Sequence, residues 1–271
     1  MKTIKPTRIV IASLLLPAGL LFGQTTNAPI AASTNAAADA LPDPFATAHA
    51  KNAKLKQPAI IPVQKTEKPN WMPQHDANVA TARKGGIDLL FVGDSITKCW
   101  VREGRNEWNA RFVPLHAADF GISGDCTQHV LWRLQNGELD TIQPKGVVLL
   151  IGTNNITSGN SPEEIAQAVS AIVAEIRKRL PATRILLLGV LPRRESHTHN
   201  DRQAIRDINE RLSKLNDGNQ VTYLDIGEKF LLPDGNMNKE LTTDFCHLTP
   251  KGYEVFATAI QPSVNDLLKK P

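Results

Sequence analysis

Four short blocks of the chain carry residue types that together could perform acyl transfer. Ser95 ends the apolar run in "LLFVGDS", Gly124 lies in "GISGD", Asn154 lies in "GTNN", and Asp244 and His247 lie in "DFCHLT". A serine hydroxyl becomes a nucleophile when a histidine takes its proton and a carboxylate orients that histidine, which predicts a Ser95–His247–Asp244 triad. The N–H groups of Ser95 and Gly124 and the side-chain amide of Asn154 would stabilise the oxyanion.

Each block also has a simpler interpretation. Ser95 could only cap the helix that follows it, and Asn154 could be a turn residue bonded to nearby backbone. G-D-S or D-x-x-H alone is a weak signal, because short motifs recur by chance at average residue usage. Four blocks in this order, each at the end of a predicted strand or in the terminal loop, favour the catalytic interpretation.

The chain alternates between predicted strands and helices. Apolar runs rich in Val, Ile and Leu predict buried strands over 86–93, 114–121, 145–152, 183–190 and 221–227. Helices are predicted over 126–139, 161–181, 200–217 and 249–268, the last of them kinked or broken near Pro262. This alternation predicts a parallel sheet between helix layers. Sites in such sheets form at the carboxyl ends of the strands, where the blocks should meet.

Together these motifs resemble the four blocks of the SGNH (GDSL) hydrolase superfamily. The segments "WMPQHDANVATARKGGIDLLFVGDSI" and "DFGISGDCTQHVLWRLQNGELDTIQPKGVVLLIGTNN" are similar to the catalytic subunits of the platelet-activating-factor acetylhydrolase type, and the similarity extends over residues 71–268. The resemblance implies a flavodoxin-like three-layer α/β/α sandwich whose five parallel strands have the order 2-1-3-4-5. It also implies the same triad and oxyanion residues, and neither a metal nor an organic cofactor.

The resemblance carries two further expectations. In the family, three residues wall the acyl pocket, and here they are Ile96, Thr153 and Cys246. A filled wall rejects extra methylenes, so acetyl is the expected acyl group. The chain departs from the family at Asp119, where Asn is usual, and at Cys126, where Thr is usual. Neither is a residue of the catalytic blocks, so we expect these differences to alter local hydrogen bonds and not the acyl-transfer reaction.

The N-terminal part of the chain has a different character. Residues 1–23 begin with three basic residues, continue as an apolar run and end at a small residue, which is the layout of a cleaved secretory signal. Pro17 and the short length of the run argue against a membrane anchor. Residues 24–66 are rich in Ala, Thr, Asn and Pro and predict a flexible linker. The hydrolase domain is then expected over 67–271, exported to the periplasm or the exterior and without a membrane span.

The composition narrows the set of partners. Of the 271 residues 41% are hydrophobic, and the net charge of +4 falls to +1 without the signal segment, which holds three of the 31 basic and none of the 27 acidic residues. A near-neutral chain gives no electrostatic case for nucleic acid. Cys99, Cys126 and Cys246 have no metal-site spacing, and whether any two pair stays open, as does a homodimer. His197 and His199 could be a metal pair, but a solvated loop is favoured because no third ligand is obvious.

These observations predict an exported serine esterase that acts on small acyl esters, above all acetyl esters of a carbohydrate. The export signal separates the chain from cytosolic animal relatives that act on phospholipid, although a lipid acetylhydrolase or lysophospholipase is the alternative. A non-catalytic binder of the same fold would normally have lost a triad residue, and none is lost. The elbow G-x-S-x-G of α/β-hydrolases is absent, because "GISGD" differs at its last position.

Overall fold

A five-stranded parallel sheet forms the centre of the computed structural model, which describes residues 57–269. The strand order is β2-β1-β3-β4-β5, as the family resemblance implies. Each strand lies within the range predicted from the sequence: β1 Leu89–Gly93, β2 Ala117–Gly121, β3 Gly146–Leu150, β4 Arg184–Leu188 and β5 Val221–Leu224. The predicted signal segment and residues 24–56 of the predicted linker lie outside the described residues.

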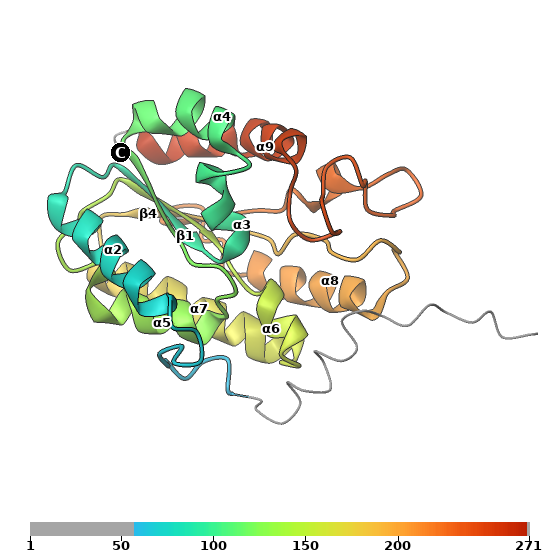
Figure 1. Ribbon diagram of the computed structural model, residues 1–271, viewed down its shortest axis with the longest axis horizontal. Coiled ribbons are helices and arrows are strands. Elements are labelled where there is room, and N and C mark those ends of the chain that lie inside the picture. The colour runs from blue at the N-terminus through green and yellow to red at the C-terminus, as the bar shows by residue number, and fades with distance from the viewer. Residues whose placement is uncertain (1–56, 270–271) are drawn as a thin grey trace, which may run out of the picture. The chain divides into compact units, whose positions relative to one another are not determined.

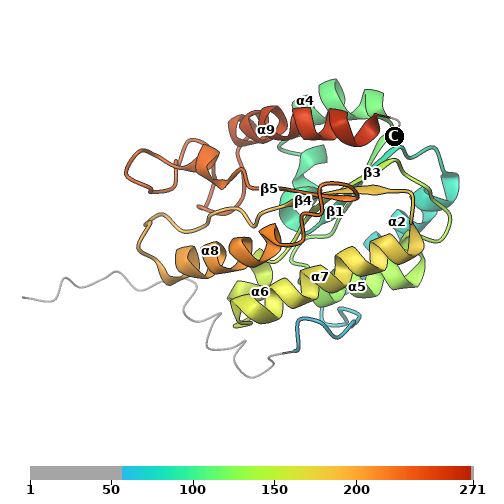
Figure 2. The ribbon, with the colours of Figure 1, turned by 180° about the vertical axis from the view of Figure 1, so that it is seen from behind.

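Helices cover both faces of the sheet, so the predicted three-layer α/β/α sandwich is confirmed (Figure 1). One layer contains α2 (Trp71–Lys84), α5 (Thr127–Arg133), α7 (Pro162–Arg179) and α8 (Asn200–Ser213). The other layer contains α4 (Arg105–Glu107) and α9 (Pro250–Leu268), and the view from behind shows the same arrangement (Figure 2). Two short helices, α3 (Ser95–Lys98) and α6 (Thr153–Thr157), start just beyond the ends of β1 and β3.

Strand β1 shows why the sheet must be covered twice. Its side chains alternate between the faces. Leu90 and Val92 belong to the core beneath α5 and α7. Leu89 and Phe91 belong to the opposite core, which also holds Trp100. All residues of β1 are buried, as expected for a central parallel strand.

The long helix α7 begins and ends where the sequence predicts. Ser161 is the cap, and its Oγ accepts the Glu164 N–H at 3.2 Å while the Glu164 carboxylate accepts the Ser161 N–H at 2.7 Å. Pro162 occupies the first helical position, where its missing N–H costs nothing. Arg177, Lys178 and Arg179 lie in the last turn, near the negative end of the helix dipole.

Packing modifies the predicted course of two helices. The sequence predicts that the last helix is kinked or broken near Pro262, and α9 runs through Pro262 without a break. An internal proline costs about 3 kcal/mol, and buried side chains before and after it, among them Ile260 and Val264, hold the two halves of α9 on the sheet. The helix predicted over 126–139 loses regular geometry after Arg133, since Gly137 has φ +110°.

The last part of the predicted linker also differs from expectation. Residues 57–66 pack on the domain, where the Thr127 hydroxyl donates to the Ala59 carbonyl at 2.8 Å. The Val63 N–H donates to the Gln128 carbonyl at 3.3 Å, and Ala59 is buried. The linker prediction is therefore wrong for residues 57–66. Within residues 57–269, none of the helices has the length and apolar character needed to cross a bilayer.

Candidate active site

Ser95 lies on a sharp turn between β1 and α3. Gly93 ends the strand, and a Cβ at this position would lie 2.2 Å from the Thr97 hydroxyl, so a side chain does not fit. Asp94 caps α3, because its Oδ1 accepts the Ile96 N–H at 2.9 Å. Ser95 is therefore the first helical residue and not the cap. The alternative interpretation of Ser95 as a helix cap is wrong.

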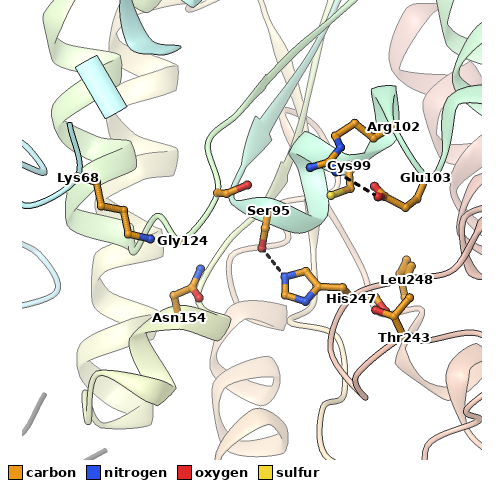
Figure 3. A pocket seen from close by; sticks show the side chains of 11 residues that line it. Lys68, Ser95, Cys99, Arg102, Glu103, Gly124, Asn154, Thr243, His247 and Leu248 are labelled. Carbon is orange, nitrogen blue, oxygen red and sulfur yellow. Dashed lines mark hydrogen bonds and ion pairs between the residues drawn. The ribbon is translucent and has the colours of Figure 1, made fainter. Parts of the chain in front are cut away.

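A continuous hydrogen-bond chain joins Ser95, His247 and Asp244. Ser95 Oγ lies 2.9 Å from His247 Nε2 (Figure 3), and His247 Nδ1 lies 2.8 Å from Asp244 Oδ2. The other carboxylate oxygen accepts the backbone N–H of His247 at 2.7 Å and that of Cys246 at 3.1 Å. Burial acts to raise the pKa of Asp244, but these bonds and the imidazole outweigh it and hold the pKa below its ordinary value. The ionised carboxylate can hold Nδ1–H, which leaves Nε2 to accept the serine proton.

Asp244 and His247 belong to a loop that is fixed by backbone contacts. The Thr243 N–H donates to the His247 carbonyl at 2.8 Å, so the loop closes on itself. Phe245 has φ +57°, a left-handed conformation that costs energy for a bulky residue. Its carbonyl accepts the Arg194 N–H at 2.9 Å, which ties the loop to the segment after β4. The imidazole is thus presented by a constrained backbone.

A cavity of about 450 Å³ opens beside the hydroxyl, and Ser95, Gly124 and Asn154 all line it. Gly124 has φ +79°, which favours glycine. Asn154 Nδ2 donates to the Asp125 carbonyl at 2.9 Å and lies 3.4 Å from Asp94 Oδ2. The second contact is long, so one amide hydrogen can turn to a stronger acceptor. The structure therefore brings the predicted oxyanion residues to one cavity.

A buried ionic network lies beneath this cavity. Arg133 donates to Asp125 Oδ2 at 2.8 Å, to Glu138 Oε2 at 2.5 Å and to the Gly93 carbonyl at 3.2 Å. Trp71 Nε1 donates to the remaining oxygen of Asp125 at 2.7 Å. The side chains of Arg133, Asp125 and Glu138 are all fully buried. The guanidinium thus connects the end of β1 to the loop that carries Gly124.

Two lysines from the segment before α2 reach the same loop. Lys65 Nζ donates to the Gly124 carbonyl, and Lys65 is only 5% exposed. Lys68 lines the cavity, with its ammonium beside Gly124 (Figure 3). Burial lowers the pKa of Lys65, although the carboxylate of Asp125 opposes this. Neither lysine is predicted as a site residue, because the segment that holds both of them carries no motif and no strand or helix periodicity.

The three predicted acyl-pocket residues do not line the open cavity. Ile96 and Thr153 are buried, with exposed fractions of 2% and 5%. The Cys246 thiol is hydrogen-bonded to the Thr153 side chain, and burial raises its pKa to about 11. Arg193 donates to the Thr153 carbonyl at 3.0 Å and so helps to fix the backbone of this residue. Their role in acyl selection stays a prediction.

The two departures from the family pattern have local explanations. Asp119 Oδ1 accepts the Gly121 N–H at 2.7 Å, and burial raises the pKa of Asp119 to about 7. Below that pH the protonated carboxyl is a neutral polar group, as an asparagine amide would be. Cys126 Sγ lies 3.7 Å from Ser158 Oγ, and the buried thiol keeps a hydrogen-bond partner where the family has a threonine hydroxyl.

The two histidines considered as a metal pair each have another hydrogen-bond partner, and the cysteines form no disulfide. His197 Nδ1 lies 3.1 Å from Asn236 Oδ1, and His199 Nδ1 accepts the Asp201 N–H at the start of α8. Among residues 57–269, no group of three or more His, Cys, Asp or Glu side chains is arranged to hold a metal ion. The three cysteines are free thiols, which answers the question of pairing.

A hydroxyl, an imidazole and a carboxylate in series, at the carboxyl edge of a parallel sheet covered on both faces, define the class of the protein. It is an α/β/α hydrolase with the residue set of serine-dependent acyl transfer. Comparison with known proteins then gives the family. The chain belongs to the GDSL-like lipase/acylhydrolase family, which matches residues 91–255.

The relatives are named acetylhydrolases. Platelet-activating factor acetylhydrolase IB subunit alpha2 of Rattus norvegicus is 40% identical over 201 residues, which are 74% of this chain and 86% of that protein. Subunit alpha1 of the same enzyme from Homo sapiens is 37% identical over 199 residues, or 73% and 84% of the two chains. The resemblance inferred from the sequence is confirmed, and the protein is an esterase of the acylhydrolase type.

Solved structures share the fold at lower identity. A GDSL-like lipase from Bacteroides thetaiotaomicron has a TM-score of 0.60 and 20% identity, and the match covers 73% of this chain and 98% of that one. An acetylxylan esterase from Geobacillus stearothermophilus has a TM-score of 0.54 and 17% identity, with 69% and 98% covered. At these identities the similarity establishes the fold alone.

Proposed function

We propose that the protein is an exported serine esterase that removes acetyl groups from carbohydrates. The observation that carries this proposal is the hydrogen-bond chain from Ser95 through His247 to Asp244 at the wall of the cavity. The names of the relatives that are 37–40% identical support acetyl as the acyl group.

The geometry supports a two-step acyl transfer. Ser95 Oγ attacks the ester carbonyl carbon while His247 Nε2 takes the hydroxyl proton, and the carbonyl oxygen becomes an oxyanion. The oxyanion is stabilised by the N–H groups of Ser95 and Gly124 and by the Asn154 amide. The C–O bond to the alcohol then breaks, and the alcohol leaves with the proton from His247. Water repeats the sequence on the acetyl-serine, which releases acetate and restores the hydroxyl.

The cavity supports a polar alcohol as the other half of the substrate. Apart from Leu248 and Cys99, its lining consists of glycine and of polar or charged side chains: Lys68, Ser95, Arg102, Glu103, Ser123, Asn154, Thr243 and His247. Such groups can replace the hydrogen bonds that sugar hydroxyls make to water. The signal-like layout of residues 1–23 supports export.

A lipid acetylhydrolase is the second candidate. The observation that favours it is the 40% identity to a platelet-activating factor acetylhydrolase subunit. In that case an acetylated glycerophospholipid, and not an acetylated sugar, would be the better substrate. The catalytic steps would be the same, because only the alcohol differs.

The proposal is tested by kcat/KM for two sets of esters. Across p-nitrophenyl esters, acetyl should exceed butyryl by about tenfold and octanoyl should be nearly inert, because Ile96, Thr153 and Cys246 leave little room. Ile96→Ala should relax that preference. Acetylated xylan and pectin fragments should be cleaved faster than short-chain phospholipids. A flat acyl profile would contradict the pocket, and faster phospholipid cleavage would favour the second candidate.

A further inference from the structure

Lys68 brings a positive charge into the cavity from outside the four catalytic blocks. It belongs to the segment before α2 and lines the cavity together with Ser95, Asn154 and His247. A Cβ placed on Gly124 would lie 2.9 Å from Lys68 Nζ, so the ammonium stands directly over the loop of the oxyanion hole. Figure 3 shows the side chain reaching toward Gly124, on the far side of the cavity from Arg102.

The ammonium of Lys68 has no hydrogen-bond or ion-pair partner among residues 57–269. Its neighbour Lys65 is already bound to the Gly124 carbonyl. The nearby carboxylate of Asp125 is occupied by Arg133 and Trp71. The Lys68 charge is therefore available to a ligand in the cavity.

The opposite wall carries cancelling charges. Arg102 Nη2 lies 3.7 Å from Glu103 Oε1, so the charges of these two side chains largely offset each other. Lys68 thus gives the cavity a positive side next to the oxyanion loop. Anions bound there would be favoured over neutral groups of the same shape.

The positions of the three predicted acyl-pocket residues indicate which half of the ester lies next to Lys68. Ile96 and Thr153 are buried and, with Cys246, lie outside the cavity lining. The open cavity therefore holds the alcohol half. We propose that Lys68 recognises an anionic substituent, a carboxylate or a phosphate, on the alcohol half of the ester, so that the carbohydrate substrate is an acidic one. This inference rests on the proposed esterase function and adds the charge of the substrate.

The test compares two aryl acetates of nearly equal shape, 4-acetoxybenzoate and its neutral amide 4-acetoxybenzamide. The measured quantity is the ratio of kcat/KM for the anionic ester to that for the neutral one, which cancels general effects of a variant on the reaction. In Lys68→Met this ratio should fall about fivefold, the scale of one partly exposed charge pair. The change should lie mainly in KM, because the charge pair exists before and during the reaction.

Two further variants serve as controls. Lys68→Arg keeps the charge and should retain most of the ratio. Lys84→Met removes the same charge from an exposed position at the end of α2 and should leave the ratio unchanged. In wild type the ratio should also fall at 0.5 M salt, because an exposed charge pair is screened.

Equal losses on both esters in Lys68→Met would overturn the proposal, since Lys68 would then act on the reaction centre and not on the substituent. A ratio that is unchanged in Lys68→Met would overturn it as well. If wild type cleaves neither ester, the proposed function is wrong; Lys68 is then tested by titration with 4-hydroxybenzoate and 4-hydroxybenzamide, where weaker binding of the anion alone in Lys68→Met supports the site and equal binding refutes it.

The source of the anion is distinguished with natural esters. A 3-O-acetyl galacturonide is compared with its neutral methyl ester, and 2-acetyl glycerophosphocholine is measured alongside. A Lys68→Met loss on the free galacturonide that is absent from the methyl ester supports a sugar carboxylate. A loss confined to the phospholipid supports the anion site but assigns it to a phosphate, and no loss on either overturns the proposal.

Discussion

Replacing Arg133 with methionine should be among the most destabilising single changes in the domain. The substitution keeps an unbranched apolar stem and removes the guanidinium, with its charge and all its donors. Asp125 and Glu138 are both fully buried, and each would lose the guanidinium that now pairs with its carboxylate. Breaking a buried ion pair from one side costs about 3–5 kcal/mol, because a charge is left without a partner.

The loss should depend on pH. In the wild type, burial acts to raise the pKa of Glu138, but Arg133 and the other donors hold that pKa below its ordinary value. Without Arg133, burial dominates and the folded-state pKa lies above the unfolded one. The carboxylates can then be protonated at low pH, so the stability deficit of Arg133→Met should be smaller near pH 4 than near pH 8, above the packing loss that the shorter side chain causes at every pH.

The assay is urea unfolding followed by tryptophan fluorescence at several pH values, with m-values compared to verify that the cooperativity is unchanged. For a domain of this size, a loss of 3–5 kcal/mol lowers Tm by about 6–20 °C. Arg177→Met is the matched control, because Arg177 pairs with Asp217 at 3.3 Å on the surface and its loss should cost less than about 1 kcal/mol. Equal effects of the two substitutions, or a deficit in Arg133→Met that does not change with pH, would refute this account of the network.

Four further predictions concern the site and its N-terminal segment. Ser95→Ala should lower kcat on an aryl acetate by about 10⁴ with an unchanged circular dichroism spectrum, and near wild-type turnover would remove Ser95 from the mechanism. Asn154→Ala should lower kcat by roughly 10² to 10³ with a smaller change in KM, because its bond to the oxyanion strengthens in the transition state; an effect on KM alone would point to substrate binding. Burial raises the pKa of Asp94 to about 7, so the stability that this group contributes is present below its unfolded pKa near 4 and is lost as pH rises through 7. The stability of Asp94→Asn relative to wild type should therefore increase from pH 5 to pH 8 by more than about 1 kcal/mol, and parallel urea midpoints at both pH values would contradict this. A chain that starts at residue 67 should be less stable and less active than one that starts at 57, since it lacks the Lys65 contact to Gly124, and equal Tm and kcat/KM in the two chains would show that the contact is dispensable.

The strands, and the meeting of Ser95, His247 and Asp244 at one edge of the sheet, could be predicted from the sequence because their signals are local. Each strand is a short apolar run, and each candidate catalytic residue stands within a few positions of a strand end or, for Asp244 and His247, within one short block. Parallel strands place their carboxyl ends at one edge, so blocks far apart in sequence meet without further information. The path of α9 through Pro262 could not be predicted in this way, because packing on both sides of the proline decides it.

The contributions of Lys65, Lys68 and α2 could not be predicted, for a different reason. Lys65 contacts a carbonyl 59 positions away, and its segment has neither strand nor helix periodicity. Helix α2 buries the polar side chains of His75 and Asn78, so the face that packs on the domain lacks the apolar periodicity that predicts a helix. Both features depend on hydrogen bonds between distant residues, such as that from Asn78 to Glu138 at 2.9 Å.

The separation of the nucleophile from its base sets the order in which activity appears during synthesis. Ser95 and His247 are 152 positions apart, whereas His247 and Asp244 are three apart. All five strands precede residue 225, so a nascent chain can contain the whole sheet and the nucleophile turn before the base has been translated. Helix α9, whose Tyr253 hydroxyl donates to the Ile96 carbonyl at 2.7 Å, must then dock to hold the last loop against Ser95. A nascent chain that has not yet reached His247 therefore holds the serine without its base, and the hydrogen-bond chain can form only after α9 has been made and has docked.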